Sequence, residues 1–151
     1  MQKSIFLLLV LIVATAYAQI PTDKKVGLGV IFGEPTGISF KYWLQSTTAV
    51  DAAAAWSFEG ENALHLHANF LYHYPGVLNV SKGTALLFAG VGGRLKFQNK
   101  SKASVRFPLG AEYILENGPF EFFLEFVPLL DLAPSTKFDL NGGIGFRFYF
   151  K

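Results

Sequence analysis

Three histidines at alternate positions are the residues of this sequence that most readily suggest chemistry. His65, His67 and His73 all fall at odd numbers within one apolar segment. In an extended strand they would point to the same side, with the Cα atoms of His65 and His67 about 6.5–7 Å apart. Zinc needs a third ligand and usually a fourth, and the sequence has no cysteine. We therefore expect buried, hydrogen-bonding histidines and no cofactor, with metal binding as the weaker alternative.

A serine near one of these histidines offers a second kind of chemistry. If the intervening turn is centred on Gly60-Glu61, Ser57 lies opposite His65, and a glutamate of that turn could complete a hydrolase-like set. However, the serine has no nucleophile elbow and no identifiable oxyanion donors. The sequence also has no phosphate-binding loop, zinc motif or dinucleotide fingerprint. We expect no enzymatic activity and keep a lipid-modifying enzyme as an alternative.

In the neighbouring apolar segments, charged residues lie on the same face as the histidines. The five basic residues are Lys41, Arg94, Lys96, Arg106 and Arg147. The five acidic residues are Asp51, Glu112, Glu121, Glu125 and Asp139. Equal numbers predict an internal network of ion pairs, since buried charges are tolerated when paired, and we expect Arg147 to pair with Glu125 or Glu121. A charge-selective pore would show an excess of one sign, so a narrow or gated pore is the alternative.

The segments that carry these residues have a period of two, which is the signature of β-strands. We expect eight strands, at Val26–Phe32, Gly37–Leu44, Ala49–Phe58, Leu64–Tyr74, Thr84–Phe97, Ser104–Leu115, Phe120–Leu130 and Phe138–Phe150. Asn117-Gly118 is a strong hairpin signal. Pro108 and Pro128 fall inside strands and cannot donate to a ladder, so each should require a bulge or a local break. The pattern contains no helix, and its turns suit an up-and-down antiparallel meander.

The volumes of the side chains indicate which face of the strands points outward. With the signal segment described below removed, 18 of the 22 remaining aromatic residues lie on the apolar face, and the exceptions are Trp43, Phe88, Phe123 and Tyr149. The interior of an eight-stranded barrel only just accommodates ordinary side chains, so eighteen rings cannot fit inside. The opposite face is rich in glycine and alanine, which suit a crowded interior. The pattern therefore predicts a transmembrane β-barrel with its aromatic face toward lipid, and a soluble barrel and an open sandwich are the weaker alternatives.

The first 18 residues have the features of a signal peptide. Lys3 precedes the apolar run Ile5–Ala14, and Ala16-Tyr17-Ala18 offers a cleavage site before Gln19. We expect residues 1–18 to be removed and residues 19–151 to form one barrel domain. Without Lys3, 12 basic and 11 acidic residues leave a net charge of +1, which gives no electrostatic footprint for nucleic acid.

The last strand carries a resemblance to a known family. It reads Gly142-Gly143-Ile144-Gly145-Phe146-Arg147-Phe148-Tyr149-Phe150-Lys151. With its alternating aromatics, the chain resembles the small OmpA/OmpX-like outer-membrane barrels, and in particular a branch of eight-stranded barrels found in spirochaetes. The resemblance implies recognition of this strand by the barrel-assembly machinery, although Lys151 follows the usual terminal Phe. It also implies termini on the periplasmic side, with the turns after the first, third, fifth and seventh strands facing outward.

These observations together predict a monomeric, non-enzymatic barrel of the outer membrane with a filled, ion-paired interior. Its expected partners are outer-membrane lipids and the assembly machinery. A structural role in the cell envelope and a surface-binding role through the rim both fit, and a surface protein ligand is left open. At the outer rim, Lys100 and Lys102 form a basic loop within Gln98–Lys102 that could contact lipid phosphates or a protein.

Overall fold

The computed structural model describes residues 25–57 and 62–150, so the expected signal segment, most of the turn after residue 57, and Lys151 lie outside the described residues. The described chain is all-β. Its strands are β1 (Val26–Glu34), β2 (Thr36–Trp43), β3 (Thr48–Ser57), β4 (Ala63–Tyr74), β5 (Thr84–Phe97), β6 (Lys102–Arg106), β7 (Leu109–Ile114), β8 (Phe120–Ala133) and β9 (Lys137–Phe150). Within the described ranges, no helix has the length and apolar character needed to cross a membrane.

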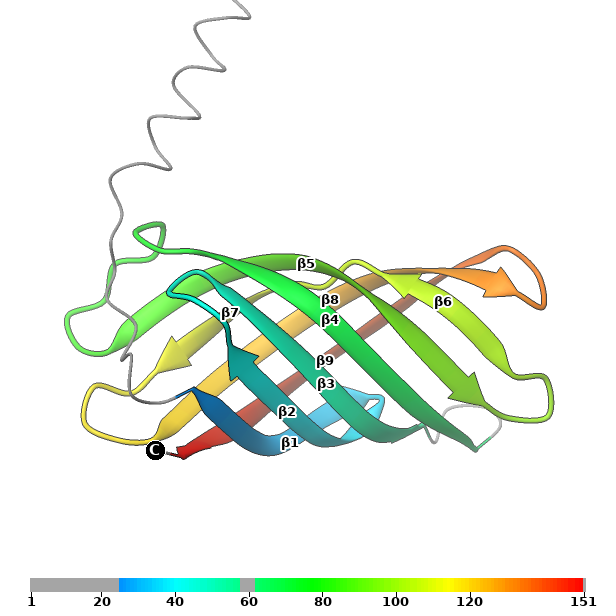
Figure 1. The fold of residues 1–151 in the computed structure, drawn as a ribbon, viewed down its shortest axis with the longest axis horizontal. Helices are drawn as coiled ribbons and strands as arrows, with labels where there is room; N and C mark the ends of the chain where they lie inside the picture. The colour runs from blue at the N-terminus through cyan, green and yellow to red at the C-terminus, as the bar shows by residue number, and fades with distance from the viewer. Residues whose placement is uncertain (1–24, 58–61, 151) are drawn as a thin grey trace, which may run out of the picture.

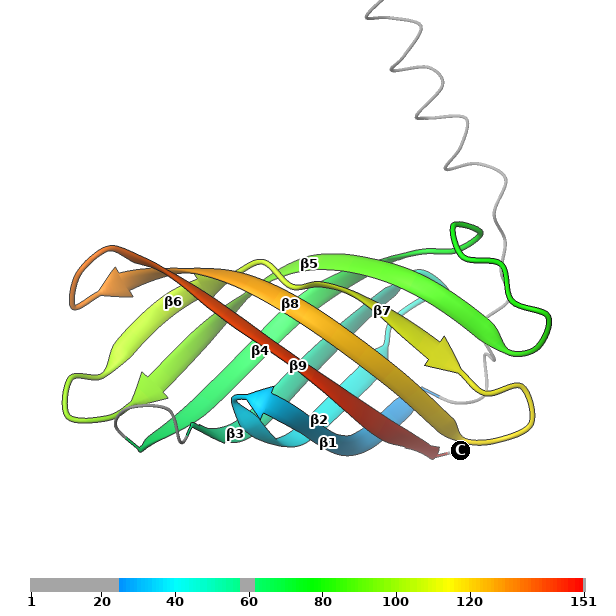
Figure 2. The same cartoon turned by 180° about the vertical axis from the view of Figure 1, so that it is seen from behind.

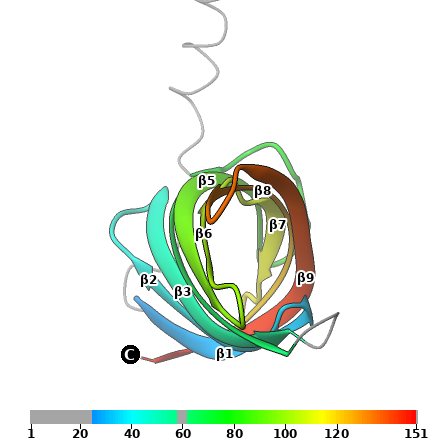
Figure 3. The same ribbon diagram turned by 90° about the vertical axis from the view of Figure 1, so that its right-hand side faces the viewer.

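All nine strands belong to one antiparallel sheet with the order β4-β3-β2-β1-β9-β8-β6-β5-β7. Further pairings join β4 to β5 and β8 to β7. The strands are long and strongly tilted (Figures 1 and 2), and an end view shows them arranged around a common interior (Figure 3). The first strand, β1, pairs along its whole length with the last strand, β9, from Val26 opposite Phe150 to Glu34 opposite Gly142. We call the end with Val26 and Phe150 the terminal end. The turns β1–β2, β5–β6 and β8–β9 lie at the far end.

The sixth expected strand is present as two strands, which explains why there are nine rather than eight. β6 and β7 are separated by Phe107 and Pro108, where the proline has no N–H for the ladder. The pairing register on β8 is the same on both sides of this break, because Arg106 lies opposite Leu129 and Leu109 lies opposite Phe126. The break expected at Pro108 is therefore confirmed.

The break expected at the other proline is wrong. β8 runs without interruption through Pro128, which lies opposite Leu140 of β9. On its other side Pro128 faces the interrupted segment, where its carbonyl accepts a hydrogen bond from the Phe107 N–H at 2.9 Å. The irregularity of this region instead falls between Ala103 and Ser104, where the pairing with β8 shifts. Pro128, which has no N–H to donate, therefore lies opposite the gap between β6 and β7, where the ladder is already interrupted.

The sheet has one polar, buried face and one apolar, exposed face. The four aromatic residues assigned to the polar face, Trp43, Phe88, Phe123 and Tyr149, are at most 5% exposed. Large apolar side chains on the other face are much more exposed, for example Leu124 at 55% and Ile144 at 64%. Small residues allow the interior to close around its large side chains, since an added Cβ at Gly145 would lie 2.5 Å from the Phe123 ring. The expectation that the apolar face points outward is confirmed.

Candidate functional site

The buried face brings together most of the charged residues selected from the sequence. Eight of the ten are buried: Lys41, Asp51, Arg94, Arg106, Glu112, Glu121, Glu125 and Arg147. Lys96 and Asp139 are half-buried at the far end. The charged side chains form two clusters along the interior, one toward each end of the sheet. Strand alternation places these charged side chains on the buried face, because every second residue of a strand points to the same side of the sheet.

The terminal-end cluster is centred on Lys41 of β2. Its Nζ lies 2.5 Å from Glu112 Oε2 and 3.4 Å from Glu121 Oε2. His73 lies in the same cluster, with Nε2 3.1 Å from Lys41 Nζ and 3.2 Å from Glu112 Oε1. The Lys41 ammonium also lies 4.2 Å from the ring centroid of Trp43. One lysine therefore contacts two carboxylates, an imidazole and an indole, all within the interior.

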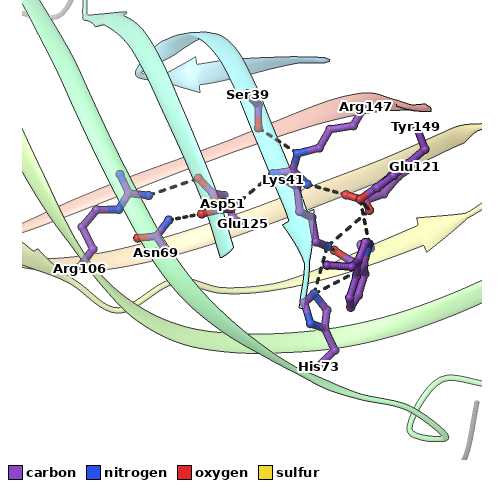
Figure 4. Close-up of polar contacts among 12 residues, drawn as sticks. Ser39, Lys41, Asp51, Asn69, His73, Arg106, Glu121, Glu125, Arg147 and Tyr149 are labelled. Carbon is purple, nitrogen blue, oxygen red and sulfur yellow. Dashed lines mark hydrogen bonds and ion pairs between the residues drawn. The ribbon is translucent and has the colours of Figure 1, made fainter. Parts of the chain in front are cut away.

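Arg147 of β9 links this cluster to the middle of the interior (Figure 4). Its Nη1 lies 2.5 Å from Glu121 Oε1, its Nη2 lies 3.4 Å from Asp51 Oδ2, and its Nε donates to Ser39 Oγ at 2.9 Å. The guanidinium also lies 3.9 Å from the Phe123 ring centroid. Each of its three nitrogens therefore has a partner, which is the condition for tolerating a buried guanidinium.

Polar neighbours extend the terminal-end cluster without adding charge. The Tyr149 hydroxyl donates to Glu121 Oε2 at 2.5 Å and lies 3.2 Å from Trp43 Nε1. Asn69 Nδ2 donates to Asp51 Oδ1 at 2.7 Å. The sequence placed these side chains on the interior face, but their roles depend on cross-strand distances that alternation does not give.

The far-end cluster is built around Arg94 and Arg106. Arg94 Nη2 lies 2.8 Å from Asp131 Oδ1 and 3.0 Å from Ser104 Oγ, and Nη1 lies 3.8 Å from Asp139 Oδ2. Arg106 makes a looser contact, with Nη2 3.5 Å from Glu125 Oε1. Lys96 forms no ion pair with any described residue. Contacts in this cluster are on the whole longer than those around Lys41 and Arg147.

Asp131 is the charged residue that sequence reasoning missed. The seventh strand was expected to end at Leu130, whereas β8 continues to Ala133 and places Asp131 in the interior at 1% exposure. Asp131 also lies 3.2 Å from Lys102 Nζ, so Lys102 of the expected rim loop belongs to the far-end cluster. Lys100, in contrast, is exposed. Asp131 continues the alternation of the buried residues Val127 and Leu129, and this alternation could have identified it as an interior residue from the sequence.

The partner of Arg147 is Glu121 rather than Glu125. The expected register placed Arg147 opposite or diagonal to Glu125, but Glu121 lies directly opposite Arg147, and Glu125 lies opposite Gly143. The centre of the β8–β9 turn thus lies closer to the N-terminus than expected. When the centre of a hairpin turn moves by one residue, the residue opposite a given position changes by two. Of the two partners named, one is confirmed and the other is corrected.

The register around the histidines is also shifted from the expected one. His65 lies opposite Ala55 and His67 lies opposite Ala53, while Ser57 lies opposite Ala63. The Ser57 hydroxyl donates instead to the Glu34 carboxylate. The expected pairing of Ser57 with His65 is therefore wrong, whereas Glu59 and Glu61, the glutamates considered with them, lie outside the described residues.

The three histidines do not converge on one point. His73 belongs to the terminal-end cluster, whereas His65 and His67 lie beside Lys96 and Arg94 on β5. Over residues 25–57 and 62–150, no group of three or more histidine, aspartate or glutamate side chains could hold a metal ion. The described interior contains charged side chains, most of which form ion pairs, and a set of hydrogen bonds among polar groups. No family model, curated protein or solved structure matches the chain.

Proposed function

We propose that this chain is an eight-stranded transmembrane β-barrel of the outer membrane, with a filled, ion-paired interior and a non-enzymatic role in the cell envelope. The role is structural or surface-binding, through the far-end rim. The observation that carries this proposal is the pairing of one charged, buried face with one exposed, apolar face on the same sheet. The apolar segment at the N-terminus and its expected cleavage site support export across the inner membrane.

The strand pairings support closure of the sheet. From His67 the register passes through Arg94, Ser104 and Asp131 to Lys137 of β9. In the other direction it passes through Ala53, Ser39 and Gly29 to Arg147 of the same strand. The two routes thus reach β9 at Lys137 and at Arg147, which are ten residues apart. Closed barrels require such a stagger, because their strands tilt relative to the axis.

The exposed face supports a lipid environment. Fourteen aromatic residues are among the exposed large apolar side chains, and the exposed set also includes leucines and isoleucines from most strands. Soluble monomers rarely expose contiguous apolar patches larger than a few hundred Å², whereas a transmembrane barrel needs an apolar band around its circumference. β8 and β9, each of 14 residues, exceed the 9–11 residues that a tilted strand needs to cross a bilayer.

The balance of interior charges supports a filled barrel rather than a selective pore. The ten charged residues selected from the sequence, together with Lys102 and Asp131, comprise six cationic and six anionic side chains. A charge-selective channel would carry an excess of one sign. Large side chains, including Phe88, Phe123 and Tyr149, occupy the same interior and leave little space for solute in an eight-stranded barrel.

We expect the refolded protein to show no stepwise conductance of porin size in planar lipid bilayers. The double variant Phe123→Ala/Arg147→Ala removes a stacked pair from the middle of the interior and serves as the matched control for the sensitivity of the assay. Conductance in that variant but not in the unaltered protein would support the filled barrel. Open-channel steps in the unaltered protein would instead favour the narrow or gated pore.

A further inference from the structure

Several buried polar atoms in the far-end half of the interior have no hydrogen-bond partner among the described residues. Eight of them are nitrogens: Nε, Nη1 and Nη2 of Arg106, Nη1 of Arg94, both ring nitrogens of His65, Nδ1 of His67 and Nδ2 of Asn141. Arg106 Nη2 and Arg94 Nη1 have only the carboxylate contacts of 3.5 and 3.8 Å given above. Two oxygens also lack a hydrogen bond, Asn69 Oδ1 and Asp131 Oδ2, and the latter lies 3.2 Å from Lys102 Nζ. The five side chains that carry the nitrogens belong to residues at most 8% exposed. Buried polar groups in folded proteins are normally hydrogen-bonded, so eight unpaired nitrogens in one region call for a physical account.

These five side chains converge if the sheet closes as proposed, and the inference therefore rests on the proposed barrel. His67 lies directly opposite Arg94, and His65 lies two residues further along β4. A stagger of ten residues over eight strands places His67, Arg106 and Asn141 at about the same height, with β9 across the barrel from β4. Gly37, Ala53 and Ala55 are the interior residues of the wall that faces Arg106, and their small side chains leave room.

The chemistry of the unpaired atoms selects an anion. The guanidinium and amide nitrogens can only donate hydrogen bonds, and each neutral imidazole donates from one nitrogen. At the far end, the cations Arg94, Lys96, Lys100, Lys102, Arg106 and Lys137 outnumber the carboxylates Glu34, Glu125, Asp131 and Asp139 by two. Guanidinium groups match the geometry of phosphate oxygens and bind them through parallel hydrogen bonds. A bound cation would leave the donors unpaired.

A cavity at the far-end mouth provides the approach to this region. It has a volume of about 620 Å³ and is lined by the β5–β6 and β8–β9 turns, including Lys100, Lys102, Lys137 and Asp131. Three lysines at an entrance raise the local concentration of anions. Asp131 lines this cavity and its Oδ1 lies 2.8 Å from Arg94 Nη2, so Arg94 connects the cavity to the unpaired donors.

We propose that the far-end half of the interior is a binding site for a phosphate-class oxyanion, held by Arg106, His67, Asn141, His65 and Nη1 of Arg94. Such an anion accepts hydrogen bonds from all sides and supplies acceptors for the donor nitrogens that lack partners. The oxyanion is either free or the phosphate monoester of a larger solute that reaches in from the mouth cavity.

Calorimetric titration of the protein, refolded in detergent, with inorganic phosphate and with glycerol 3-phosphate tests this site at constant ionic strength in chloride. We expect saturable binding of one phosphate, weakened about ten- to a hundred-fold in Arg106→Gln, which loses hydrogen bonds to a charged group. The matched control is Lys82→Gln, which removes the same charge from the β4–β5 connection at the terminal end, and we expect it to leave binding unchanged.

The outcomes separate the two sources of the oxyanion. Binding of phosphate alone indicates an enclosed free oxyanion, and binding of glycerol 3-phosphate as well indicates a monoester site. Heat-dependent mobility on unboiled gels reports whether each variant is a folded barrel, so failure of the barrel proposal is distinguishable from failure of this site. If Arg106→Gln does not fold, Asn141→Leu takes its place. Binding of neither probe by the folded protein, or equal binding by the site variants, would overturn the proposal.

Discussion

Replacing Arg147 with methionine is expected to lower the free energy of unfolding by about 3–5 kcal/mol. The substitution leaves Glu121 as a buried carboxylate without its 2.5 Å partner and removes the contacts to Asp51 and Ser39. Glu121→Gln should be destabilising for the complementary reason. In the double variant neither charge is left unpaired, so the loss should be smaller than the sum by roughly 0.5–3 kcal/mol. Reversible unfolding from lipid vesicles measures all three variants.

Asp131→Asn is the matched control for this cycle. Asp131 is an equally buried carboxylate on the same strand, but its partners are Arg94 and Lys102. It lies ten residues from Glu121, which is about 33 Å along a strand, so its effect should add to that of Arg147→Met. If the stability changes of Arg147→Met and Glu121→Gln were also strictly additive, this result would contradict the ion pair between Arg147 and Glu121.

A charge placed on the outer face should be almost as costly as one removed from the interior. Leu124 is 55% exposed and lies opposite Ile144 on the apolar face. Near the middle of a bilayer, Leu124→Arg should cost about 2–4 kcal/mol, whereas the same change on a water-exposed surface usually stays within about 0.5 kcal/mol. Unfolding from lipid vesicles is again the measurement.

The comparison for Leu124→Arg is Asn117→Arg, in the exposed β7–β8 turn, where the added charge meets water and should change stability little. A cost for Leu124→Arg no larger than that of the control would reverse the assignment of the apolar face to lipid. A large cost confined to Leu124 supports that assignment independently of any interior ion pair.

Sequence reasoning succeeded where a property depends on alternation alone. The period of two placed Trp43, Phe88, Phe123 and Tyr149 inside, and it located all the main strands. It also assigned Arg147, Glu121 and Glu125 to one face. These successes share a cause, because the side-chain period of a strand is fixed by the backbone and tolerates errors at the strand ends.

The failures concern register and strand length, which depend on turns. A shift in the centre of the β8–β9 turn exchanged Glu125 for Glu121 opposite Arg147, and a similar shift before β4 separated Ser57 from His65. The extension of β8 past Leu130 brought in Asp131 through pairing with β6 and β9. Such pairing stabilises strand ends through contacts distant in sequence, which a local pattern does not contain.

The depth profile of β8 in a bilayer tests the central claim most directly. The chain has no cysteine, so Phe120→Cys, Phe126→Cys and Leu132→Cys can each carry a single fluorophore on the outer face, with Ser135→Cys in the β8–β9 turn as the control. We predict the strongest quenching by nitroxides deep in the acyl chains at residue 126, weaker quenching at residues 120 and 132, and the weakest at residue 135. Equal accessibility of all four labels to aqueous iodide, with no quenching from the lipid, would contradict a transmembrane barrel.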